Sequence, residues 1–261
     1  MRKTFIVLLT ISTVLIGFAL GWYFNSSSSS EDLLPQPFDS ELEPIVMEEP
    51  LPLPPPPVIQ FSVSQHKKRT VRDFFKSCNL SGNRKELINA CDYDHSEVRN
   101  KSVELAGQNP GELNVGQICD VFDYCFKNWK YVNDPAQNEI VELASNSLAN
   151  GLNGDCDDFA VLVCSMILAI GGDARINYAH NSESGHAFTE VNIGNTNVQE
   201  YIRSRYRDNM NSSEIFSRKD QQGNQWLNLD WFANHPGGKY FDFANGTTYY
   251  ILQKVCTDIF E

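Results

Sequence analysis

The stretch GDCDDFA at residues 154–160 decides the fold, because it places one cysteine where a glycine-containing turn meets a long apolar segment. Apolar residues recur at helical spacing over residues 159–170 and fill most of the circumference, which predicts a helix buried on nearly all sides. Asp155 is a favourable N-cap, and the glycine pair at 171–172 ends the helix. Cys156 is therefore expected at the first helical position.

The start of this helix favours a thiolate at Cys156. Unpaired backbone N–H groups and the positive end of the helix dipole lower a thiol pKa below its ordinary value of about 8.5. Asp155 and Asp157 oppose this effect because they place negative charge beside the sulfur. We therefore expect the thiolate to need a cation such as a histidinium. The alternative is that Cys156 is a buried structural thiol, as free cysteines often are.

A hairpin is predicted after the helix, and it carries a histidine. Residues 174–179 alternate as a strand, residues 181–185 have the composition of a turn, and residues 186–193 alternate again. His186 opens the second strand, where it can lie at the sheet edge and face the helix N-terminus. An ordinary turn histidine is the alternative interpretation.

A further strand, residues 225–231, carries a carboxylate. Trp226, Asn228 and Asp230 share one face of this strand because side chains alternate with a period of two. Asp230 is therefore a candidate for a buried or half-buried carboxylate, with an ordinary aspartate near a turn as the alternative.

Cys156, His186 and Asp230, in this chain order and on these elements, resemble the transglutaminase-like superfamily of papain-type thiol enzymes. The resemblance covers about residues 96–231. It rests on WKY at 129–131 with DP at 134–135, GDCDDFA at 154–160, GGDAR at 171–175, GHAFTEV at 185–191 and WLNLD at 226–230. The chain departs from the family at Phe188, where a tryptophan or similar aromatic is usual, and in an insertion at residues 198–223.

The resemblance implies a covalent acyl-transfer mechanism. Cys156 is then the nucleophile, His186 pairs with the thiolate and protonates the leaving amine, and Asp230 orients the imidazole. The backbone N–H of Cys156 is the natural first oxyanion donor. The indole N–H of Trp129 or the hydroxyl of Tyr131 is a candidate for the second donor, with a core aromatic as the alternative for either.

These residues are compatible with two functions of different classes. The first is a cysteine peptidase or transglutaminase that acts on peptide or protein amides, in which water or an amine resolves the acyl-enzyme. The second is a non-catalytic transglutaminase-like module that keeps the fold as a binding scaffold of the cell envelope. The presence of all three polar groups favours the enzyme.

The chain start predicts a membrane anchor over residues 1–24. Arg2 and Lys3 precede the uncharged run at residues 5–24, which as a helix spans about 30 Å, the thickness of a bilayer core. We expect an uncleaved signal-anchor rather than a cleaved signal peptide. The positive charges keep the N-terminus cytoplasmic, so the rest of the chain is expected outside, in the periplasm or at the cell surface.

Residues 25–60 hold most of the prolines, a serine run and only acidic charges, which predicts a disordered linker. Residues 61–261 are long enough for one domain with its own core. An amphipathic pattern at residues 115–129 predicts a helix before the catalytic one, and residues 247–255 are expected to form a closing strand. The fold class expected is α+β, a helical front half packed on an antiparallel sheet.

We expect disulfides if the chain is exported. Of its seven cysteines, six remain when Cys156 is set aside, an even number that can pair. Cys78 with Cys91 is the first pairing expected, and Cys164 is expected to be a free apolar thiol within the helix. The cysteine spacings match no zinc template, so no metal is predicted, and no cofactor is expected either.

A formal net charge of −12 argues against a nucleic-acid partner, because phosphate binding needs a clustered basic surface. The partners expected are a peptide or protein substrate and, through the N-terminal helix, a membrane. No oligomeric state is predicted.

Overall fold

The computed structural model describes residues 52–61, 83–135, 140–210 and 214–259. The anchor expected at residues 1–24 and most of the expected linker lie outside these ranges. In the described part of the chain, no helix combines the length and the apolar character that a membrane crossing requires.

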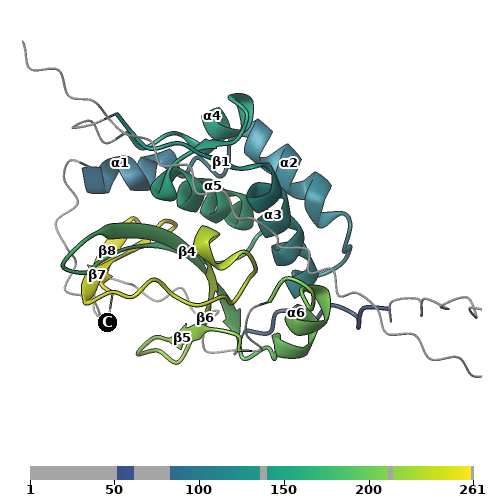
Figure 1. Cartoon of the computed structure of the whole chain (residues 1–261). Helices are drawn as coiled ribbons and strands as arrows, with labels where there is room; N and C mark the ends of the chain where they lie inside the picture. Colours follow the sequence, from purple (N-terminus) through teal and green to yellow (C-terminus); the bar gives the residue numbers. More distant parts are fainter. Residues whose placement is uncertain (1–51, 62–82, 136–139, 211–213, 260–261) are drawn as a thin grey trace, which may run out of the picture. The chain divides into compact units, whose positions relative to one another are not determined.

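Helix α5 (Cys156–Ala169) is the centre of the fold, as predicted. Asp155 is its N-cap. Asp155 and Asp158 form a capping box, in which the carboxylate of each residue accepts the backbone N–H of the other. Residues 157–168 are all buried. A helix that is apolar on all sides needs cover on all sides, and Figure 1 shows α5 between the other helices and the sheet.

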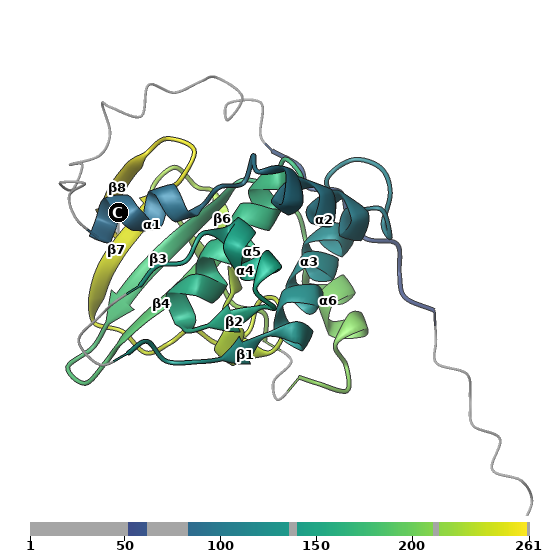
Figure 2. The ribbon, with the colours of Figure 1, turned by 90° about the horizontal axis from the view of Figure 1, so that it is seen from above.

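Four helices precede α5 in the described residues. They are α1 (Asn83–Ala90), α2 (Ser96–Ala106), α3 (Val115–Asn128) and α4 (Ala144–Ala149). Helix α3 confirms the amphipathic pattern expected at residues 115–129, and it begins at a capping box made by Asn114 and Gln117. Helices α2, α3 and α4 pack against α5, as the view from above also shows (Figure 2).

The sheet has six antiparallel strands in the order β5-β6-β4-β3-β7-β8. The strands are β3 (Ala174–His180), β4 (Gly185–Gly194), β5 (Ser217–Lys219), β6 (Gln225–Leu229), β7 (Asn245–Tyr250) and β8 (Val255–Asp258). The predicted hairpin is β3 and β4, in which Ala179 pairs with His186. The short strands β1 (Lys130–Tyr131) and β2 (Asn153–Gly154) form a separate parallel pair, and α6 (Gln199–Arg205) lies in the inserted segment. The α+β fold class is confirmed.

The two faces of β4 have different neighbours. The Thr189 hydroxyl donates to the Ala160 carbonyl at 2.7 Å, which places Thr189 on the face toward α5. Val191 and Ile193 share that face and belong to the main core. Because side chains alternate along a strand, Phe188 and Glu190 lie on the other face.

A buried ionic cluster fills the sheet face opposite α5. The Glu190 carboxylate, which is fully buried, accepts hydrogen bonds from Arg175 and Arg218 at 2.8 Å each and from the Tyr240 hydroxyl at 2.6 Å. Burial alone would raise its pKa, but the two guanidinium groups outweigh burial and lower the pKa of Glu190 to about 2. The carboxylate is therefore charged and ties four segments of the chain together.

Two predicted strand boundaries are wrong. The strand expected to run to residue 231 ends at Leu229, because Asp230 caps the short 3-10 helix η3 (Trp231–Ala233) by accepting the Phe232 N–H at 3.1 Å. The single closing strand expected at residues 247–255 is the hairpin β7–β8, whose turn contains Lys254 with φ 53°. An apolar run without glycine or proline conceals that turn in the sequence.

The last residues of the expected linker are attached to the domain. Val58 forms a bridge with Asn114, and the Ile59 N–H donates to the Leu113 carbonyl at 2.8 Å. Ile59 is 7% exposed, so its side chain belongs to the core. The linker boundary expected at residue 60 is therefore too late by a few residues.

The cysteines differ in part from the expectation. Cys91 is a free buried thiol, so the disulfide expected between Cys78 and Cys91 is wrong. Cys164 is a free thiol inside α5, as predicted. Cys256 is disulfide-bonded.

Candidate active site

Cys156 occupies the first position of α5, as the sequence predicted. The turn before it requires glycine at residue 154, since φ there is +150° and an added Cβ would lie 2.2 Å from an Asp158 oxygen. The sulfur is mostly buried and accepts a hydrogen bond from the backbone N–H of Ala187 in β4. This contact joins the start of the helix to the strand that carries His186.

Burial disfavours a thiolate at Cys156 unless a cation pairs with it, in line with the need for a cation expected from the sequence. Burial raises the pKa of the thiol to about 12, and the charges of Asp155, Asp157 and Asp230 act in the same direction. The Ala187 N–H lowers the pKa, but its effect is smaller than that of burial. The helix start alone therefore does not create a thiolate, because the loss of hydration outweighs the favourable dipole.

His186 and Asp230 form a buried pair. The His186 Nε2 atom lies 2.8 Å and 2.9 Å from the two carboxylate oxygens of Asp230, and the side chains are 3% and 0% exposed. A carboxylate only accepts hydrogen bonds, so Nε2 carries a proton and donates it. The other ring nitrogen, Nδ1, is therefore left to accept a proton in the neutral imidazole.

The end of β6 leaves an open edge beside this pair. Strand β4 pairs with β6 only from Thr189 to Gly194, so the part of β4 that contains His186 and Ala187 lies beyond the last pair. The chain turns away at Asp230 into η3. The Cys156 sulfur reaches the Ala187 N–H at this point, and Asp230 is near enough for its charge to raise the thiol pKa.

Aromatic side chains surround the His186 ring, and sequence reasoning missed them. The ring centroids of Phe232, Phe241 and Phe188 lie 4.8, 5.3 and 6.1 Å from that of His186. Phe232 follows Asp230 closely, so the motif around Asp230 could have pointed to it. Phe241 lies in an irregular segment without periodicity, so no sequence pattern indicates it. Phe232 is 63% exposed, so it partly covers the imidazole while facing solvent.

The two candidate oxyanion donors have different surroundings. Tyr131 is 39% exposed and packs on Trp231 at 5.0 Å between ring centroids. Burial raises the pKa of Tyr131 to about 12, and the next largest cause is the charge of Cys156, which places the phenol near the sulfur. Trp129 is buried against Phe159, and its indole N–H has no hydrogen-bond partner in the described part of the chain.

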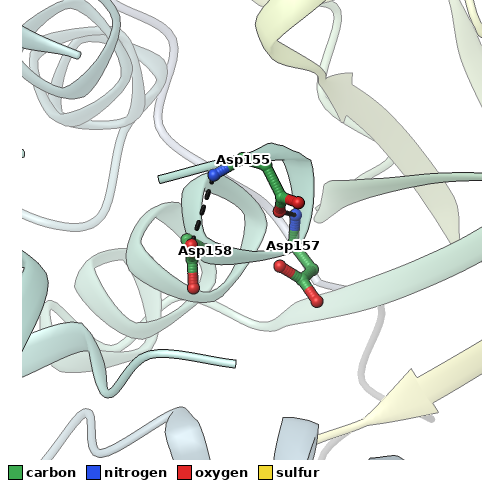
Figure 3. A group of neighbouring side chains, drawn as sticks. All are labelled: Asp155, Asp157 and Asp158. Carbon is green, nitrogen blue, oxygen red and sulfur yellow. Dashed lines mark hydrogen bonds between the residues drawn. The ribbon is translucent and has the colours of Figure 1, made fainter. Parts of the chain in front are cut away.

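Three carboxylates gather at the start of α5 (Figure 3). One oxygen from each of Asp155, Asp157 and Asp158 lies within 4.8 Å of the others, and among the described residues no other group of this kind has metal-ligand spacing. Figure 3 shows the hydrogen bonds that hold them: Asp155 accepts the Asp157 N–H at 3.3 Å, and Asp158 accepts the Asp155 N–H at 3.2 Å. Capping of the helix start accounts for these two contacts.

The comparisons with known proteins concern the family of this domain. A family model of the transglutaminase-like superfamily matches residues 102–231, a range that contains Cys156, His186 and Asp230. None of the curated proteins matches the chain.

Two solved structures resemble the chain. A "Putative Cysteine Protease" from Cytophaga hutchinsonii has 16% identity over 70% of this chain and 53% of that chain, with a TM-score of 0.40. A "putative protease" from Parabacteroides distasonis has 11% identity over 61% of this chain and 30% of that chain, with a TM-score of 0.34. The chain thus matches only about half of the first structure and less of the second. Through the domain that the family model matches, the chain belongs to the transglutaminase-like superfamily.

Proposed function

We propose that this chain is a thiol enzyme that acts on peptide or protein amides through Cys156, His186 and Asp230. The observation that carries the proposal is the buried contact of His186 Nε2 with both oxygens of Asp230. That contact leaves Nδ1 as the proton acceptor, and it occurs next to Ala187, whose N–H touches the Cys156 sulfur. A nucleophile, a base and a group that orients the base are the parts that covalent acyl transfer needs.

The raised pKa of Cys156 determines how the first step runs. A thiolate alone is unfavourable in this buried position, so the proton leaves the sulfur only when a base inside the site takes it. Transfer from Sγ to Nδ1 of His186 adds no net charge to the site. The carboxylate of Asp230 stabilises the imidazolium that forms.

The reaction then proceeds by acyl transfer. The sulfur attacks the amide carbon and forms a carbon–sulfur bond, and the carbonyl electron pair moves to oxygen. When the tetrahedral intermediate collapses, the carbon–nitrogen bond breaks and the imidazolium gives its proton to the leaving amine. The thioester is resolved by water, which gives hydrolysis, or by a primary amine, which gives a cross-link.

The Cys156 N–H serves as the first oxyanion donor because it is an unpaired amide at a helix start. We propose the Tyr131 hydroxyl as the second donor, since the phenol is close enough to Cys156 for the two groups to interact electrostatically. Trp129 is the rival, because its buried indole N–H lacks a partner in the described residues.

The test is a turnover assay on the full chain with a peptide library and a fluorescent primary amine. Cleaved peptides identify a peptidase, and amine incorporation identifies a transglutaminase. Either activity should disappear in Cys156→Ala. If wild type and Cys156→Ala are equally inert while the chain binds a library peptide, the enzyme proposal fails and a binding scaffold is the better description.

We also propose that the domain is anchored to a membrane and works outside the cytoplasm. The apolar run at residues 5–24 and the disulfide at Cys256 support this, because structural disulfides persist in oxidising compartments. Protease added to intact cells should digest the domain, and N-terminal sequencing should find Arg2 or Met1. Loss of the first 25 or so residues would contradict the anchor.

A further inference from the structure

We propose that a cavity at the start of α5 binds the ammonium group of an alkyl amine, such as a lysine side chain of the substrate peptide. The cavity has a volume of about 280 Å³ and is lined by residues of the β1–β2 region, α4 and the start of α5. Gly154 and Asp158, which both line it, flank Cys156 in the sequence, whereas Cys156 is not among the described lining residues, since side chains two positions apart on a helix do not face each other. As a subsite for substrate, it rests on the function proposed above.

The cavity carries negative charge without a compensating cation. Asp134, Glu142 and Asp158 line it, and the described lining residues include no lysine, arginine or histidine. Hydrogen bonds already hold the carboxylates in place: Asp134 accepts the Ile140 N–H at 2.5 Å, and Asp158 accepts the Glu142 N–H at 2.7 Å. A positively charged guest is therefore the ligand that this lining favours.

The negative charge around the cavity also affects the pKa of Asp158. Burial raises the pKa of this carboxyl to about 6, and the charges of Asp155 and Asp134 act in the same direction, against two backbone N–H groups. An ammonium group in the cavity would relieve this repulsion.

Ser147 supplies an independent observation. This residue lines the same cavity and is 1% exposed, and its hydroxyl has no hydrogen-bond partner within the described ranges. Buried hydroxyl groups in proteins are usually paired, because an unpaired one loses its bonds to water without replacement. A ligand with N–H donors would satisfy this oxygen.

The apolar part of the lining suits an alkyl chain. Val132 and Ile140 are 52% and 41% exposed, and they line the cavity together with Pro135. Methylene groups can pack on these side chains while the charged end reaches the carboxylates, as lysine side chains commonly do.

The lining favours an ammonium over a guanidinium. The Glu142 Oε1 atom accepts a hydrogen bond from Asn146 at 2.5 Å, and both Asp158 oxygens accept backbone N–H groups. Neither carboxylate therefore presents two unoccupied oxygens to a ligand. A compact ammonium with three donors can bind single oxygens, whereas guanidinium prefers two oxygens of one carboxylate.

The lining also favours an organic cation over a metal ion. Asp134 and Glu142 do not belong to any group of three described residues whose ligand atoms lie within 4.8 Å of one another. Calcium needs six to eight oxygens at about 2.3–2.6 Å, which a cavity with separated carboxylates does not provide.

The first experiment measures substrate preference in the full chain. Peptide amides that carry lysine or its uncharged analogue norleucine are compared at each position near the scissile bond. We expect lysine to raise kcat/KM about tenfold at one position, in line with a hydrogen-bonded charge. The double variant Asp134→Asn/Glu142→Gln should reduce this ratio to near one, whereas Glu104→Gln on the exposed surface of α2 should not change it. An unchanged ratio in the double variant would overturn the subsite.

The second experiment measures binding without turnover. Amide resonances of the full-length Cys156→Ala chain are followed by NMR during titration with n-pentylammonium, 1-pentanol or Ca²⁺. We expect saturable shifts at Val132, Ser147 and Asp158 with pentylammonium only, and their loss in the variant that also carries Asp134→Asn/Glu142→Gln. Saturable shifts with Ca²⁺ alone, or none with pentylammonium, would overturn the proposal.

The two experiments separate the subsite from the enzyme. If pentylammonium binds but no peptide is turned over, the proposed function fails and the ammonium site stands. If peptides are turned over in a Cys156-dependent way without lysine preference or pentylammonium binding, the subsite fails and the proposed function stands.

Discussion

At the scale of single residues, the chemistry depends on where the Cys156 proton goes. Burial raises the pKa of this thiol to about 12, so in the proposed mechanism a thiolate forms in useful amounts only if His186 accepts the proton. The nearby carboxylate of Asp230 disfavours a lone thiolate but favours an imidazolium. The same side chain thus opposes one charge and supports the other, which couples the three residues.

The first prediction concerns the pH dependence of alkylation in His186→Ala. Without the imidazole, the thiolate fraction should rise about tenfold per pH unit between pH 7 and pH 10, since both values lie below the thiol pKa. The rate constant of Cys156 modification by iodoacetamide, followed by peptide mass spectrometry, measures this. Wild type should react faster than the variant at pH 7. If the alkylation rate constant of the variant stops rising below pH 9, the thiol pKa is not raised.

The second prediction concerns Asp230→Asn. The amide of asparagine can donate to Nε2, which would move the ring proton to Nδ1 and leave no acceptor for the thiol proton. We expect kcat to fall by about 10⁴-fold, the loss known for a triad in which an amide replaces the orienting carboxylate and the histidine takes the wrong tautomer. Thermal unfolding is the control, because asparagine can still cap η3. Turnover within a few fold of wild type would exclude the orienting role.

The third prediction separates the oxyanion donors. Tyr131→Phe removes only a hydroxyl, and loss of one oxyanion donor lowers kcat by about 10²–10³-fold. Trp129→Phe is the matched variant, because it removes the indole N–H. The rate of Cys156 alkylation should stay near that of wild type in both, since alkylation builds no oxyanion. If Trp129→Phe has the larger loss in kcat, the assignment to Tyr131 is wrong.

At the scale of elements, much of the site follows from local rules. The apolar run, the Asp155 cap and the glycine stop predict α5 correctly, and alternation predicts the hairpin that carries His186. The thiol pKa was not predictable, because it depends on burial by elements that are distant in the chain. The end of β6 was also missed, since Asp230 continues the alternation but serves as a cap for η3.

The neighbours of His186 show the same limit of local rules. Phe241 packs on the imidazole from a segment without helical or strand periodicity, so only the folded chain brings it there. Ala187 contributes a backbone N–H, which no side-chain pattern reveals.

The fourth prediction concerns strand β4 and the buried Glu190. Its pKa is lowered from the ordinary value of 4.5 to about 2, so its ionisation stabilises the fold above about pH 4.5, and this stability is lost as the pH falls toward 2. The shift corresponds to about 3 kcal/mol of unfolding free energy. Urea unfolding of wild type should show this loss, and Glu190→Gln should lack it while being about 3–5 kcal/mol less stable at pH 7. Equal stability of the two proteins at pH 7 would contradict the role of the cluster.

At the scale of the whole molecule, the candidate site lies where two layers meet. The helical layer supplies Cys156, strand β4 supplies His186, the cap of η3 just after β6 supplies Asp230, and the Ala187 N–H connects Cys156 to β4. The class of fold and this division of labour were predictable from element order. The attachment of Ile59 and the free state of Cys91 were not, because pairing between distant segments leaves no periodic pattern.

The most direct test of the account is a search for the acyl-enzyme by intact-protein mass spectrometry. The full chain is mixed with a peptide amide that the turnover assay selects, quenched in acid within seconds and analysed. We predict a mass increase equal to the acyl group, removed by hydroxylamine as a thioester would be, mapped to Cys156 and absent in Cys156→Ala. The same adduct in Cys156→Ala, or steady turnover of wild type with no thioester on Cys156 even when the quench is fast, would contradict a nucleophilic role for this sulfur.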